Sequence, residues 1–357
     1  MRVLGIETSC DETSAAVVEG DGDGAALRSL VILSQDIHRV FGGVVPEIAS
    51  RAHLTAIAPV TRRALDDAGV ESGDLDAIAV THAPGLVGAL LVGVSFAKGL
   101  AASLGIPLVG VHHMEGHLFA TELEDAKAAP PLTALLVSGG HTMLLDVPAW
   151  GEYRLLGATR DDAAGEAFDK VAKLLGLPYP GGRHVEALAR GGDPTTHRFA
   201  RPMLHGGQKL GDDDFYDLSF SGLKTAVLHA VRDAEGRGVI EGARAGIARG
   251  FQDALVDTLV EKTMRAALAH GRTRIVLGGG VACNAALVTA MRERAAKRLG
   301  AAAAVYAPGP RLATDNAAMI ARAGLFRLLR GERAGPDLNA YASLPIPGLV
   351  PQAASVR

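Results

Sequence analysis

The chain has 357 residues, 48% of them apolar and 21% charged, which is an ordinary balance for a folded globular protein. This composition excludes disorder, collagen and coiled coil as the main class, and the length favours two domains. Lys and Arg number 36 against 39 Asp and Glu, so the net charge is −3 and no global basic excess points to nucleic acid. Any nucleic-acid binding must therefore be local or assisted by partners.

Segments of strand and helix character alternate through the first third of the chain. Two strands are predicted at 2–8 and 14–20, joined by a polar turn. Apolar residues at helical spacing predict a helix over 49–69. A buried strand at 75–85 then ends in a Pro-Gly turn, and a glycine-rich helix follows at 86–105. This alternation is typical of α/β proteins.

The architecture restarts after an Ala/Pro stretch at 124–131, which predicts a domain boundary. Just before it, 107–123 is predicted to be a short strand that runs into a helix. Residues 132–148 repeat the opening scheme of strand, small polar turn and strand, and 274–291 give strand, glycine turn and helix. This recurrence predicts a duplicated α/β unit whose strand ends point at one site, because open α/β sheets bind ligands at the carboxyl ends of their strands.

The cysteines and the apolar stretches indicate the compartment. Cys10 and Cys283 lie far apart, which disfavours a disulfide framework and favours a reducing environment. The N-terminal apolar stretch is too short for a signal peptide, and the uncharged stretch 83–97 falls short of the roughly 18–20 residues that cross a bilayer. We therefore expect a cytoplasmic protein with no membrane partner, in which both cysteines are packing residues.

The sharpest constellation is the histidine-rich stretch 111–117. His113 and His117 are four residues apart, so on a helix both imidazoles project from one face. Two such histidines can bind one transition metal, with a carboxylate from elsewhere as third ligand. Asp315, just ahead of a predicted helix, is either the N-cap of that helix or this missing carboxylate. The alternative for the pair is that both histidines are structural.

A zinc peptidase is a competing hypothesis for the same stretch. Its motif H-E-x-x-H places the general base directly after the first histidine. Here Glu115 follows His113 by two positions, and a helical turn of about 100° per residue points it well away from the pair. A peptidase is therefore disfavoured.

Segment 161–177 is predicted to form an amphipathic helix. Asp162, Glu166 and Asp169 are spaced i, i+4 and i+7 and align on one face. The simple interpretation is a solvated acidic face. Like charges stacked in this way repel, however, unless a cation, an amine or a hydroxyl-rich ligand lies against them.

Two glycine turns follow predicted buried strands, at 138–142 and 278–284. Glycines at strand ends let the backbone approach a phosphate, and successive N–H groups can form an anion site. Either turn alone is a weak signal, because a Gly-Gly pair is as often a plain turn. Neither fits the fingerprint of a dinucleotide-binding fold or of a P-loop.

Taken together, the segments resemble the bacterial tRNA adenosine threonylcarbamoyltransferase family, formerly labelled glycoproteases, over about residues 1–325. The matching blocks occur in order and are long and specific. They are "GIETSCDETS", "GGVVPEIASRAH", "PGLVGALLVG", "HHMEGH", "LLVSGGHT", "DDAAGEAFDKVAKLLGLPYPGG", "LSFSGLKT", "GGGVACN" and "TDNAAMIA".

This resemblance implies a fold of the actin, Hsp70 and sugar-kinase type, with two RNase-H-like domains around a cleft. The N-terminal domain would span 1–130 and be completed by a helix at about 315–332. The second domain would span 131–314, and 333–357 would form a C-terminal tail.

The resemblance also implies a reaction and its partners. A threonylcarbamoyl group would pass from threonylcarbamoyl-adenylate to the exocyclic amine of the adenosine beside the anticodon, in tRNAs that read codons starting with A. Besides tRNA, the implied partners are an inactive paralogue that forms a heterodimer with this chain and an ATPase of the same pathway. The family's pairing uses the first domain, and the apolar helix at 85–104 is the best candidate for supporting that interface.

Roles for individual residues follow from the same resemblance. His113, His117 and Asp315 would be the ligands of one iron or zinc ion. Asp11 and Glu12 would be catalytic and would steer the attacking amine or the acyl group. The residues that would bind the adenylate, its acyl group or its ribose are Leu136, Val137, Ser138, Gly139, Gly140, Asp169, Gly182, Glu186 and Asn284.

A third candidate function is a sugar kinase or ATPase of the same superfold, because a fold alone does not fix function. It predicts ATP turnover without any need for the two histidines. The sequence makes two further predictions about charge. The arginines at 322, 327, 330 and 333 are expected on a solvated helix face, and the negative net charge predicts weak tRNA binding by the isolated chain.

Overall fold

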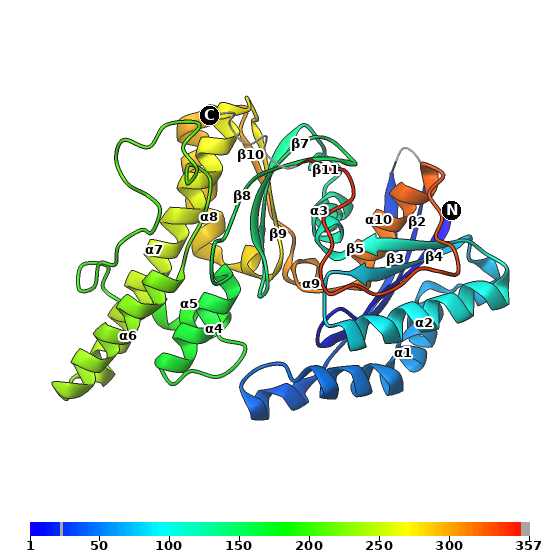
Figure 1. Cartoon of the computed structure of the whole chain (residues 1–357), viewed down its shortest axis with the longest axis horizontal. Coiled ribbons are helices and arrows are strands. Elements are labelled where there is room, and N and C mark those ends of the chain that lie inside the picture. Colours follow the sequence, from blue (N-terminus) through cyan, green and yellow to red (C-terminus); the bar gives the residue numbers. More distant parts are fainter. Residues whose placement is uncertain (22–23, 351–357) are drawn as a thin grey trace. The chain divides into compact units, whose positions relative to one another are not determined.

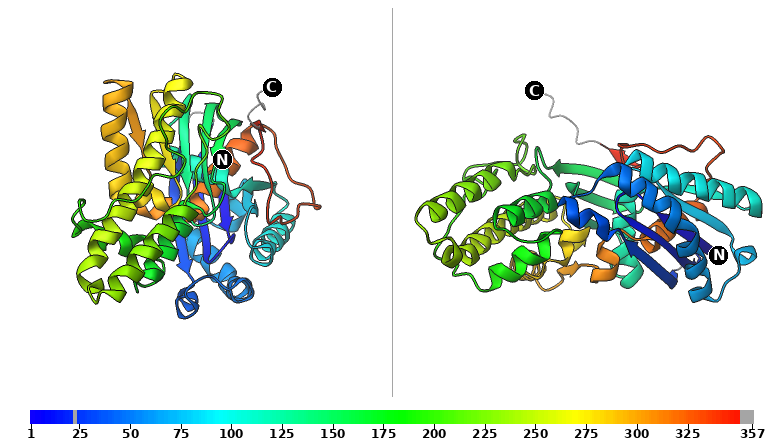
Figure 2. Two further views of the ribbon diagram at one scale, coloured as in Figure 1. Left: turned by 60° about the vertical axis from the view of Figure 1, so that its left-hand side comes forward. Right: turned by 90° about the horizontal axis from the view of Figure 1, so that it is seen from below.

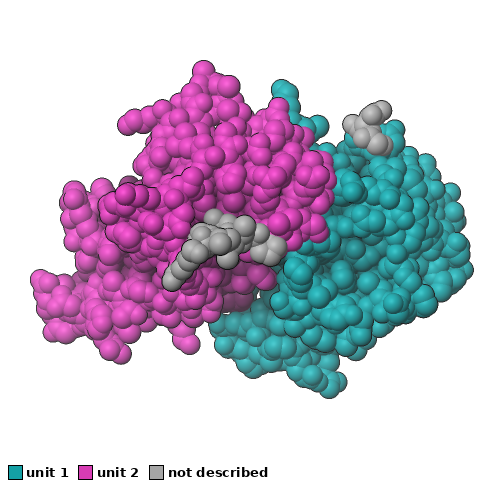
Figure 3. Space-filling model, turned by 45° about the horizontal axis from the view of Figure 1, so that its top comes forward, with its two compact units in different colours: residues 1–127, 308–347 teal, residues 128–307, 348–357 magenta. Residues whose placement is uncertain are grey.

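The computed structural model describes residues 1–21 and 24–350. The chain divides into two compact units, coloured separately in Figure 3. Unit 1 contains residues 1–127 and 308–347, and unit 2 contains 128–307 with 348–350 among the described residues. Unit 1 is therefore built from two segments that are distant in sequence.

Unit 1 has a five-stranded sheet in the order β3-β2-β1-β4-β5 (Figure 1). The first three strands are antiparallel to one another, whereas β4 runs parallel to β1 and β5 parallel to β4. The strands are β1 (Arg2–Glu7), β2 (Glu12–Gly20), β3 (Ala25–Ser34), β4 (Ala77–Ala83) and β5 (Leu108–His112).

Helices cover both faces of this sheet, as Figures 1 and 2 show. The helical segments of unit 1 are η1 (Asp36–Phe41), α1 (Pro46–Ala68), η2 (Ser72–Asp74), α2 (Val87–Leu104), α3 (His113–Glu124), α9 (Pro310–Ala313) and α10 (Ala317–Leu329). Side chains alternate between the faces of a strand, and β1 shows the result. Leu4 and Ile6 join the apolar core with α1 and α2, while a Cβ on Gly5 would lie 2.2 Å from the carbonyl oxygen of Ala317 in α10. Only glycine lets α10 approach β1 so closely.

Unit 2 repeats the same strand scheme. Its sheet has the order β10-β9-β6-β7-β8-β11, and β6, β7 and β8 are antiparallel while β9 and β10 extend the sheet in parallel from β6. Apart from β11, this order matches that of unit 1, which confirms the predicted duplication of one α/β unit. The strands are β6 (Leu132–Val137), β7 (Thr142–Ala149), β8 (Glu152–Ala158), β9 (Arg274–Gly278), β10 (Ala304–Tyr306) and β11 (Leu349–Val350).

The core of unit 2 is a large apolar cluster that the helices share with the sheet. Phe168 and Phe251 meet edge to face in it, with ring centroids 5.2 Å apart. The helical segments are α4 (Ala164–Leu174), α5 (Gly182–Arg190), α6 (Ser221–Gly236), α7 (Ile240–Ala269), η3 (Gly280–Cys283) and α8 (Ala285–Leu299). The predicted helix at 161–177 is thus shorter and begins at Ala164.

The segment after α10 packs as part of unit 1 and does not form a separate tail. Residues 333–347 belong to unit 1, whereas the resemblance implied a C-terminal tail at 333–357. The amide of Ala334 donates to the carbonyl of Leu108 at 2.7 Å, and Nζ of Lys98 donates to the carbonyl of Leu338 at 3.0 Å. These bonds attach the segment to β5 and α2. Residues 351–357 lie outside the described residues.

The structure bears on two predictions about the surface, one for the arginines of α10 and one for α2. Arg322 and Arg327 are buried in ion pairs, so the expectation that they lie on a solvated face is wrong. In the part of the chain that the structure describes, α2 is the one helix whose length and composition would suffice to cross a membrane. One side of α2 is buried in unit 1, with Leu90 and Val94 in the apolar core, while Val87 and Leu91 are exposed.

Candidate functional site

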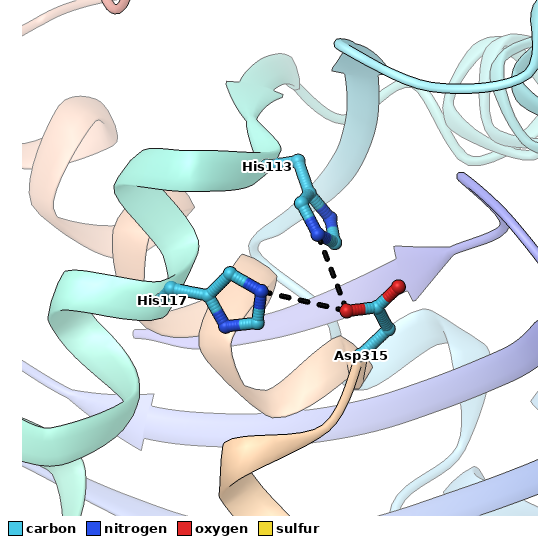
Figure 4. A group of neighbouring side chains, drawn as sticks. All are labelled: His113, His117 and Asp315. Atoms are coloured by element: carbon cyan, nitrogen blue, oxygen red, sulfur yellow. Dashed lines mark ion pairs between the residues drawn. The ribbon is translucent and has the colours of Figure 1, made fainter. Parts of the chain in front are cut away.

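Three side chains of unit 1 converge on one point (Figure 4). Nε2 of His113 lies 3.3 Å and Nε2 of His117 lies 3.4 Å from the same oxygen, Oδ1 of Asp315. One ligand atom from each residue lies within 4.8 Å of the other two. The two imidazole rings are nearly perpendicular, at 82°, with centroids 4.7 Å apart. The structure therefore brings together the two histidines and the carboxylate that the sequence singled out.

Local structure explains how these residues meet. His113 is the first residue of α3, directly after β5, so His117 follows one helical turn later on the same face. Asp315 lies between α9 and α10. The N-cap of α10 is Asn316, whose Oδ1 accepts the amide N–H of Met319 at 3.0 Å. The N-cap alternative for Asp315 is therefore wrong, and its carboxylate is directed at the histidines instead.

A buried carboxylate supports His113 from its other nitrogen. Nδ1 of His113 lies 3.1 Å from Oε2 of Glu7 and 3.2 Å from Oγ of Ser9. Glu7 is itself held, because Thr81 donates its hydroxyl to Oε2 at 2.6 Å and the amide of Ser9 donates to Oε1. A carboxylate bonded to the second nitrogen of a metal-binding histidine fixes the ring orientation and raises its basicity.

The pKa values of the two histidines shift in opposite directions. Burial alone would keep His113 neutral, but Asp315 and Glu7 outweigh it and raise the pKa of His113 well above its usual range. Burial lowers the pKa of His117, which is therefore neutral. The histidines in turn outweigh the effect of burial on Asp315 and hold the pKa of its carboxyl far below its usual range. His117 and Asp315 are thus already in the protonation states that bind metals.

The ring nitrogens of His117 test whether a metal fits. Among the described residues, neither nitrogen of this fully buried side chain has a partner in good hydrogen-bond geometry, and Nε2 has only its 3.4 Å contact with Oδ1 of Asp315. A buried polar atom left without a partner costs about 1–3 kcal/mol, so its presence calls for an explanation. A cation bound to Nε2 would satisfy that atom, and two imidazoles with one carboxylate are a donor set suited to iron or zinc. The residues present therefore fit a transition-metal ion.

Asp11 and Glu12 lie at the turn into β2, half-buried. The amide of Gln35 donates to the carbonyl of Asp11 at 3.0 Å, which ties this turn to the end of β3. Burial, together with the carboxylates of Asp315 and Asp11, raises the pKa of Glu12 well above its usual range. The raised pKa favours the protonated form of the Glu12 carboxyl, which can donate a hydrogen bond.

The first glycine turn of unit 2 connects β6 to β7. Leu136 and Val137 are fully buried in β6, so only their main chain can face a ligand. Ser138 closes the turn, since its amide donates to the carbonyl of His141 at 2.8 Å and its Oγ accepts the amide of His141 at 3.1 Å. Gly139 and Gly140 are exposed, and a Cβ on either would meet nothing within 4 Å. The turn therefore presents open main chain.

Two more glycines pack against this turn. A Cβ on Gly165, in the first turn of α4, would lie 2.6 Å from the carbonyl oxygen of Ser138. Gly279 has φ +90°, and a Cβ there would lie 2.4 Å from the carbonyl oxygen of Val137. The N-terminus of α4 and the second glycine turn thus both lie beside residues 138–140. Helix N-termini and exposed main-chain N–H groups favour anions.

The other predicted contacts to the nucleotide form a linked set. Asn284 caps α8, with Oδ1 accepting the amide of Leu287 at 3.0 Å and Nδ2 donating to Gln252 at 3.1 Å. Oε1 of Glu186, in α5, accepts the amide of Ala285 at 3.1 Å. These bonds join the start of α8 to α5 on one side and to α7 on the other.

Asp169 holds the start of α5. Its Oδ1 accepts the amide of Gly181 at 2.7 Å, directly before Gly182, whose Cα has open space around it. The other two carboxylates of the predicted acidic face meet lysines of this chain: Nζ of Lys170 lies 2.7 Å from Asp162 and 2.8 Å from Glu166. Amines of the protein thus relieve the repulsion that the sequence predicts, and Asp169 has a separate partner.

Sequence reasoning missed several residues that build these sites. Glu7 and Ser9 had no assigned role. Asp161 accepts hydrogen bonds from the hydroxyls of Ser219 at 2.5 Å and Ser221 at 2.8 Å, which attaches the "LSFSGLKT" block to the segment before α4. The sequence signal for this contact is the "LSFSGLKT" block, which supports the family resemblance but had no function assigned to it.

The two cysteines differ in how far they are exposed. Both are free. Burial and the neighbouring Asp11 raise the pKa of the Cys10 thiol, which makes it a poor nucleophile. Cys283 is exposed in η3, so the expectation that it is a packing residue is wrong.

Comparison with solved structures confirms the predicted superfold. HypF of T. kodakarensis matches with a TM-score of 0.59 and 16% identity, over 92% of this chain and 48% of that one. Component A of the (R)-2-hydroxyglutaryl-CoA dehydratase of Acidaminococcus fermentans matches with a TM-score of 0.53 and 15% identity, over 91% and 97%. At such low identity these likenesses establish the actin, Hsp70 and sugar-kinase type of fold and nothing about activity.

Sequence comparison establishes the family. The profile for tRNA N6-adenosine threonylcarbamoyltransferase matches residues 26–322. A protein of that description from Gemmatimonas aurantiaca is 69% identical over 354 residues, covering 98% of each chain. Another, from Anaeromyxobacter dehalogenans strain 2CP-C, is 56% identical over 341 residues, covering 95% of this chain and 98% of the other. These matches favour neither the peptidase nor the kinase alternative, and the chain belongs to the tRNA N6-adenosine threonylcarbamoyltransferase family, the transferases that carry out the threonylcarbamoyladenosine modification of tRNA.

Proposed function

We propose that the donor is threonylcarbamoyl-adenylate and that the acceptor is the adenosine beside the anticodon in tRNAs that read codons starting with A. The observation that carries this proposal is the convergence of His113, His117 and Asp315 in a chain of this family. In the transfer, N6 of adenosine forms a bond to the carbamoyl carbon, the bond from that carbon to the phosphate oxygen breaks, and AMP leaves. The donor is an activated mixed anhydride, so no nucleophilic serine or cysteine is needed.

His113, His117 and Asp315 would hold one iron or zinc ion in unit 1. Such an ion supplies positive charge and open coordination positions for substrate oxygens. Glu7 keeps the ring of His113 oriented toward Asp315, as its bond to Nδ1 requires. Three protein ligands are the usual number where a metal keeps a position open for substrate.

Asp11 and Glu12 are proposed to manage the proton at the acceptor. The attacking amine must lose one proton as the C–N bond forms. The raised pKa of Glu12 favours its protonated form, which would donate a hydrogen bond to a substrate oxygen, whereas Asp11 is proposed to accept the proton from N6. These two side chains would therefore take opposite roles.

In unit 2, the main chain of Ser138, Gly139 and Gly140 is proposed to bind the phosphate of the adenylate or its acyl group. Leu136 and Val137 hold that turn at the end of β6 from within the core. The nucleoside would lie along the set of residues that are linked by hydrogen bonds at the starts of α5 and α8. These are Asp169, Gly182, Glu186 and Asn284.

The proposed partners are tRNA, an inactive paralogue and a pathway ATPase, and the proposed compartment is the cytoplasm. Support for the paralogue comes from α1 and α2, which pack together and expose apolar side chains. Leu54 of α1 is exposed, as are Val87 and Leu91 of α2. Exposed aliphatic residues on two adjacent helices are typical of a surface that a protein partner covers.

Reconstitution tests the function. The chain would be incubated with both partners, the adenylate-forming enzyme, threonine, bicarbonate, ATP and unmodified tRNA. Formation of threonylcarbamoyladenosine, which requires His117, is the expected result. ATP turnover on a small hydroxylated acceptor that persists in His117→Ala would instead support the kinase alternative, and peptide cleavage would support the peptidase.

A tRNA titration tests the need for a partner. Affinity for nucleic acid comes largely from neutralised phosphates, and this chain has a net charge of −3. Binding by the chain alone should be weak at near-physiological salt and become tighter when the paralogue is added. Tight and steeply salt-dependent binding by the chain alone would show that a local basic patch suffices.

A further inference from the structure

Two buried ion pairs join the helix that carries both histidines to the helix that follows Asp315. Arg327 of α10 contacts Glu115 of α3 through two hydrogen bonds, of 2.6 and 2.8 Å. Arg322 contacts Glu122 in the same two-point manner, at 2.8 and 2.9 Å. The Glu115 side chain is fully buried and the other three are at most 11% exposed.

These pairs lie away from the histidines themselves. Glu115 is two positions from both His113 and His117, and about 100° of rotation per residue places it on the opposite face of α3. Arg327 lies near the C-terminal end of α10, whereas Asp315 precedes the N-terminal end. The ion pairs therefore act on the helices that carry the ligands and do not touch the ligands.

The apolar contact between α3 and α10 sets their distance. A Cβ on Gly116 would lie 3.0 Å from Cδ1 of Ile320 and 3.1 Å from Cγ of Met319, so the helices approach closely there. Apolar contact is non-directional and leaves rotation of α3 about its axis weakly determined. Two-point bonds between a guanidinium and a carboxylate are directional and fix both rotation and sliding.

Stability does not account for these pairs. The desolvation of two charges offsets most of their attraction, and well-packed apolar residues of similar volume often serve equally well or better. The best-attested use of such a buried pair is to select one register among several apolar packings. Here the register of α3 on α10 decides where both histidines lie relative to Asp315.

We propose that Glu115 and Arg327, supported by Glu122 and Arg322, are positioning residues for the metal site. They hold α3 against α10 so that the two imidazoles and the Asp315 carboxylate present their ligand atoms to one ion. This inference rests on the proposed metal-binding function of the three ligands. It assigns a role to Glu115, which has no place in a peptidase mechanism here.

The test replaces the ion pair by apolar residues and measures affinity for Co²⁺ alone by its absorption spectrum. The variant carries Glu115→Leu together with Arg327→Met, so that no unpaired charge remains buried. Glu332, the other partner of Arg327, is 44% exposed and stays solvated. We expect about tenfold weaker Co²⁺ binding, the lower end of what supporting partners of metal ligands contribute. The melting temperature should stay within about 4 °C of wild type.

Three further variants test whether the effect comes from this ion pair. The matched control, Asp146→Leu with Arg272→Met, removes a two-point ion pair of unit 2 between a buried carboxylate and a partly buried guanidinium, with bonds of 2.6 and 3.2 Å. The other arginine at Asp146, Arg154, is 56% exposed and stays solvated, and Co²⁺ affinity should be unchanged. Glu122→Leu with Arg322→Met offers the same test at the second pair, should the first variant fail to fold. The conservative Arg327→Lys, which keeps the charge but loses the two-point bond, should bind with intermediate affinity.

The outcomes separate the two proposals. Wild-type affinity in both folded α3–α10 pair variants, beside a wild-type protein whose Co²⁺ binding requires His117, overturns the positioning role alone. A wild-type protein that binds no Co²⁺ overturns the metal function and the positioning role with it. Weaker binding by a folded pair variant, with the unit 2 control unchanged, supports the proposal.

Discussion

The two units share one strand order and differ at the turn in its centre. In unit 1 the turn between β1 and β2 lies between Glu7 and Glu12, and its neighbours are the histidines and Asp315. In unit 2 the turn between β6 and β7 consists of Ser138, two glycines and a histidine. The first turn is surrounded by buried ionisable side chains, whereas the second presents the exposed main chain of two glycines, with no described atom within 4 Å of an added Cβ.

This difference shows what the fold leaves open. The same three antiparallel strands and two parallel neighbours bring a turn to the same edge of each sheet, but the residues of the turn decide which ligand can bind there. Carboxylates and imidazoles suit a cation. Glycines beside a helix N-terminus suit an anion. One architecture thus carries two turns of opposite chemical character.

We expect the largest effect when one of the three candidate metal ligands of unit 1 is removed. His117→Ala should reduce the bound transition metal from about one ion per chain to near zero, since a site of three protein ligands loses a third of them. Metal analysis of purified protein measures this. His229→Ala changes an exposed histidine of α6 and should leave the metal content unchanged. Full metal retention in His117→Ala would mean that unit 1 has no cation site at these residues.

A side chain added to the second glycine turn of unit 2, at Gly279, should destabilise the protein because it meets the backbone of β6. Gly279→Ala places a Cβ 2.4 Å from the carbonyl oxygen of Val137 at φ +90°, so we expect a loss of about 2–4 kcal/mol in the free energy of unfolding. Gly242→Ala, in α7 with open space around it, should stabilise by about 0.5–1 kcal/mol instead. Denaturant unfolding distinguishes them. Equal stability would show that close approach at Gly279 is not required.

The two units also differ in the partners of a buried cationic side chain, and this difference predicts how stability changes with pH. Arg327 meets carboxylates, whereas Lys262 of α7 donates to the main-chain carbonyls of Asp214 and Phe215, and burial lowers the pKa of Lys262 to about 8. Between pH 8 and the usual 10.5 the unfolded chain therefore binds more protons than the folded one. Stability should rise with pH across this window, by at most about 1.4 kcal/mol per pH unit from this group. The cost of the buried charge is fully present below pH 8.

Lys262→Met should remove that rise. Urea unfolding of both proteins at several pH values between 8 and 10.5 measures the difference in slope. The variant serves as its own matched background, because every other titrating group is unchanged. Identical slopes would show that the folded and unfolded states hold this proton equally well.

The smallest effect is expected at Asp169, where the side chain and the main chain of unit 2 meet. Asp169→Ala loses the bond to the amide of Gly181 and should cost about 1 kcal/mol of stability. Affinity for a non-hydrolysable adenylate analogue should fall about tenfold, as loss of a bond to a charged group implies. Calorimetric titration compares it with Asp233→Ala, an exposed carboxylate of α6. Unchanged affinity would leave Asp169 a purely structural role.

Local patterns predicted much of this arrangement. Helical spacing placed His113 and His117 on one face, and the recurring strand and turn scheme predicted the duplicated unit. Strands β3 and β8 were missed because they lie one step further from the centre of each sheet, where fewer residues are buried and the apolar pattern is weaker.

Contacts between distant residues were beyond the reach of such patterns. Glu7 supports His113 across 106 positions, and Glu115 meets Arg327 across 212. Nothing periodic links these pairs, because their contact depends on how whole elements pack. The buried arginines of α10 were assigned to solvent for this reason, since a sequence shows the charge and not the carboxylate opposite it.

The division of unit 1 into two segments also determines when His113, His117 and Asp315 can come together during synthesis. His113 and His117 leave the ribosome about 200 residues before Asp315, and at about 5–20 residues per second that interval lasts roughly 10–40 s. Throughout it the face of β1 that Gly5 opens to α10 has no helix to cover it. The whole of segment 128–307 is synthesised before Asp315 appears. A chain that stops before residue 315 lacks the carboxylate, so the three side chains can converge only after that residue has been synthesised.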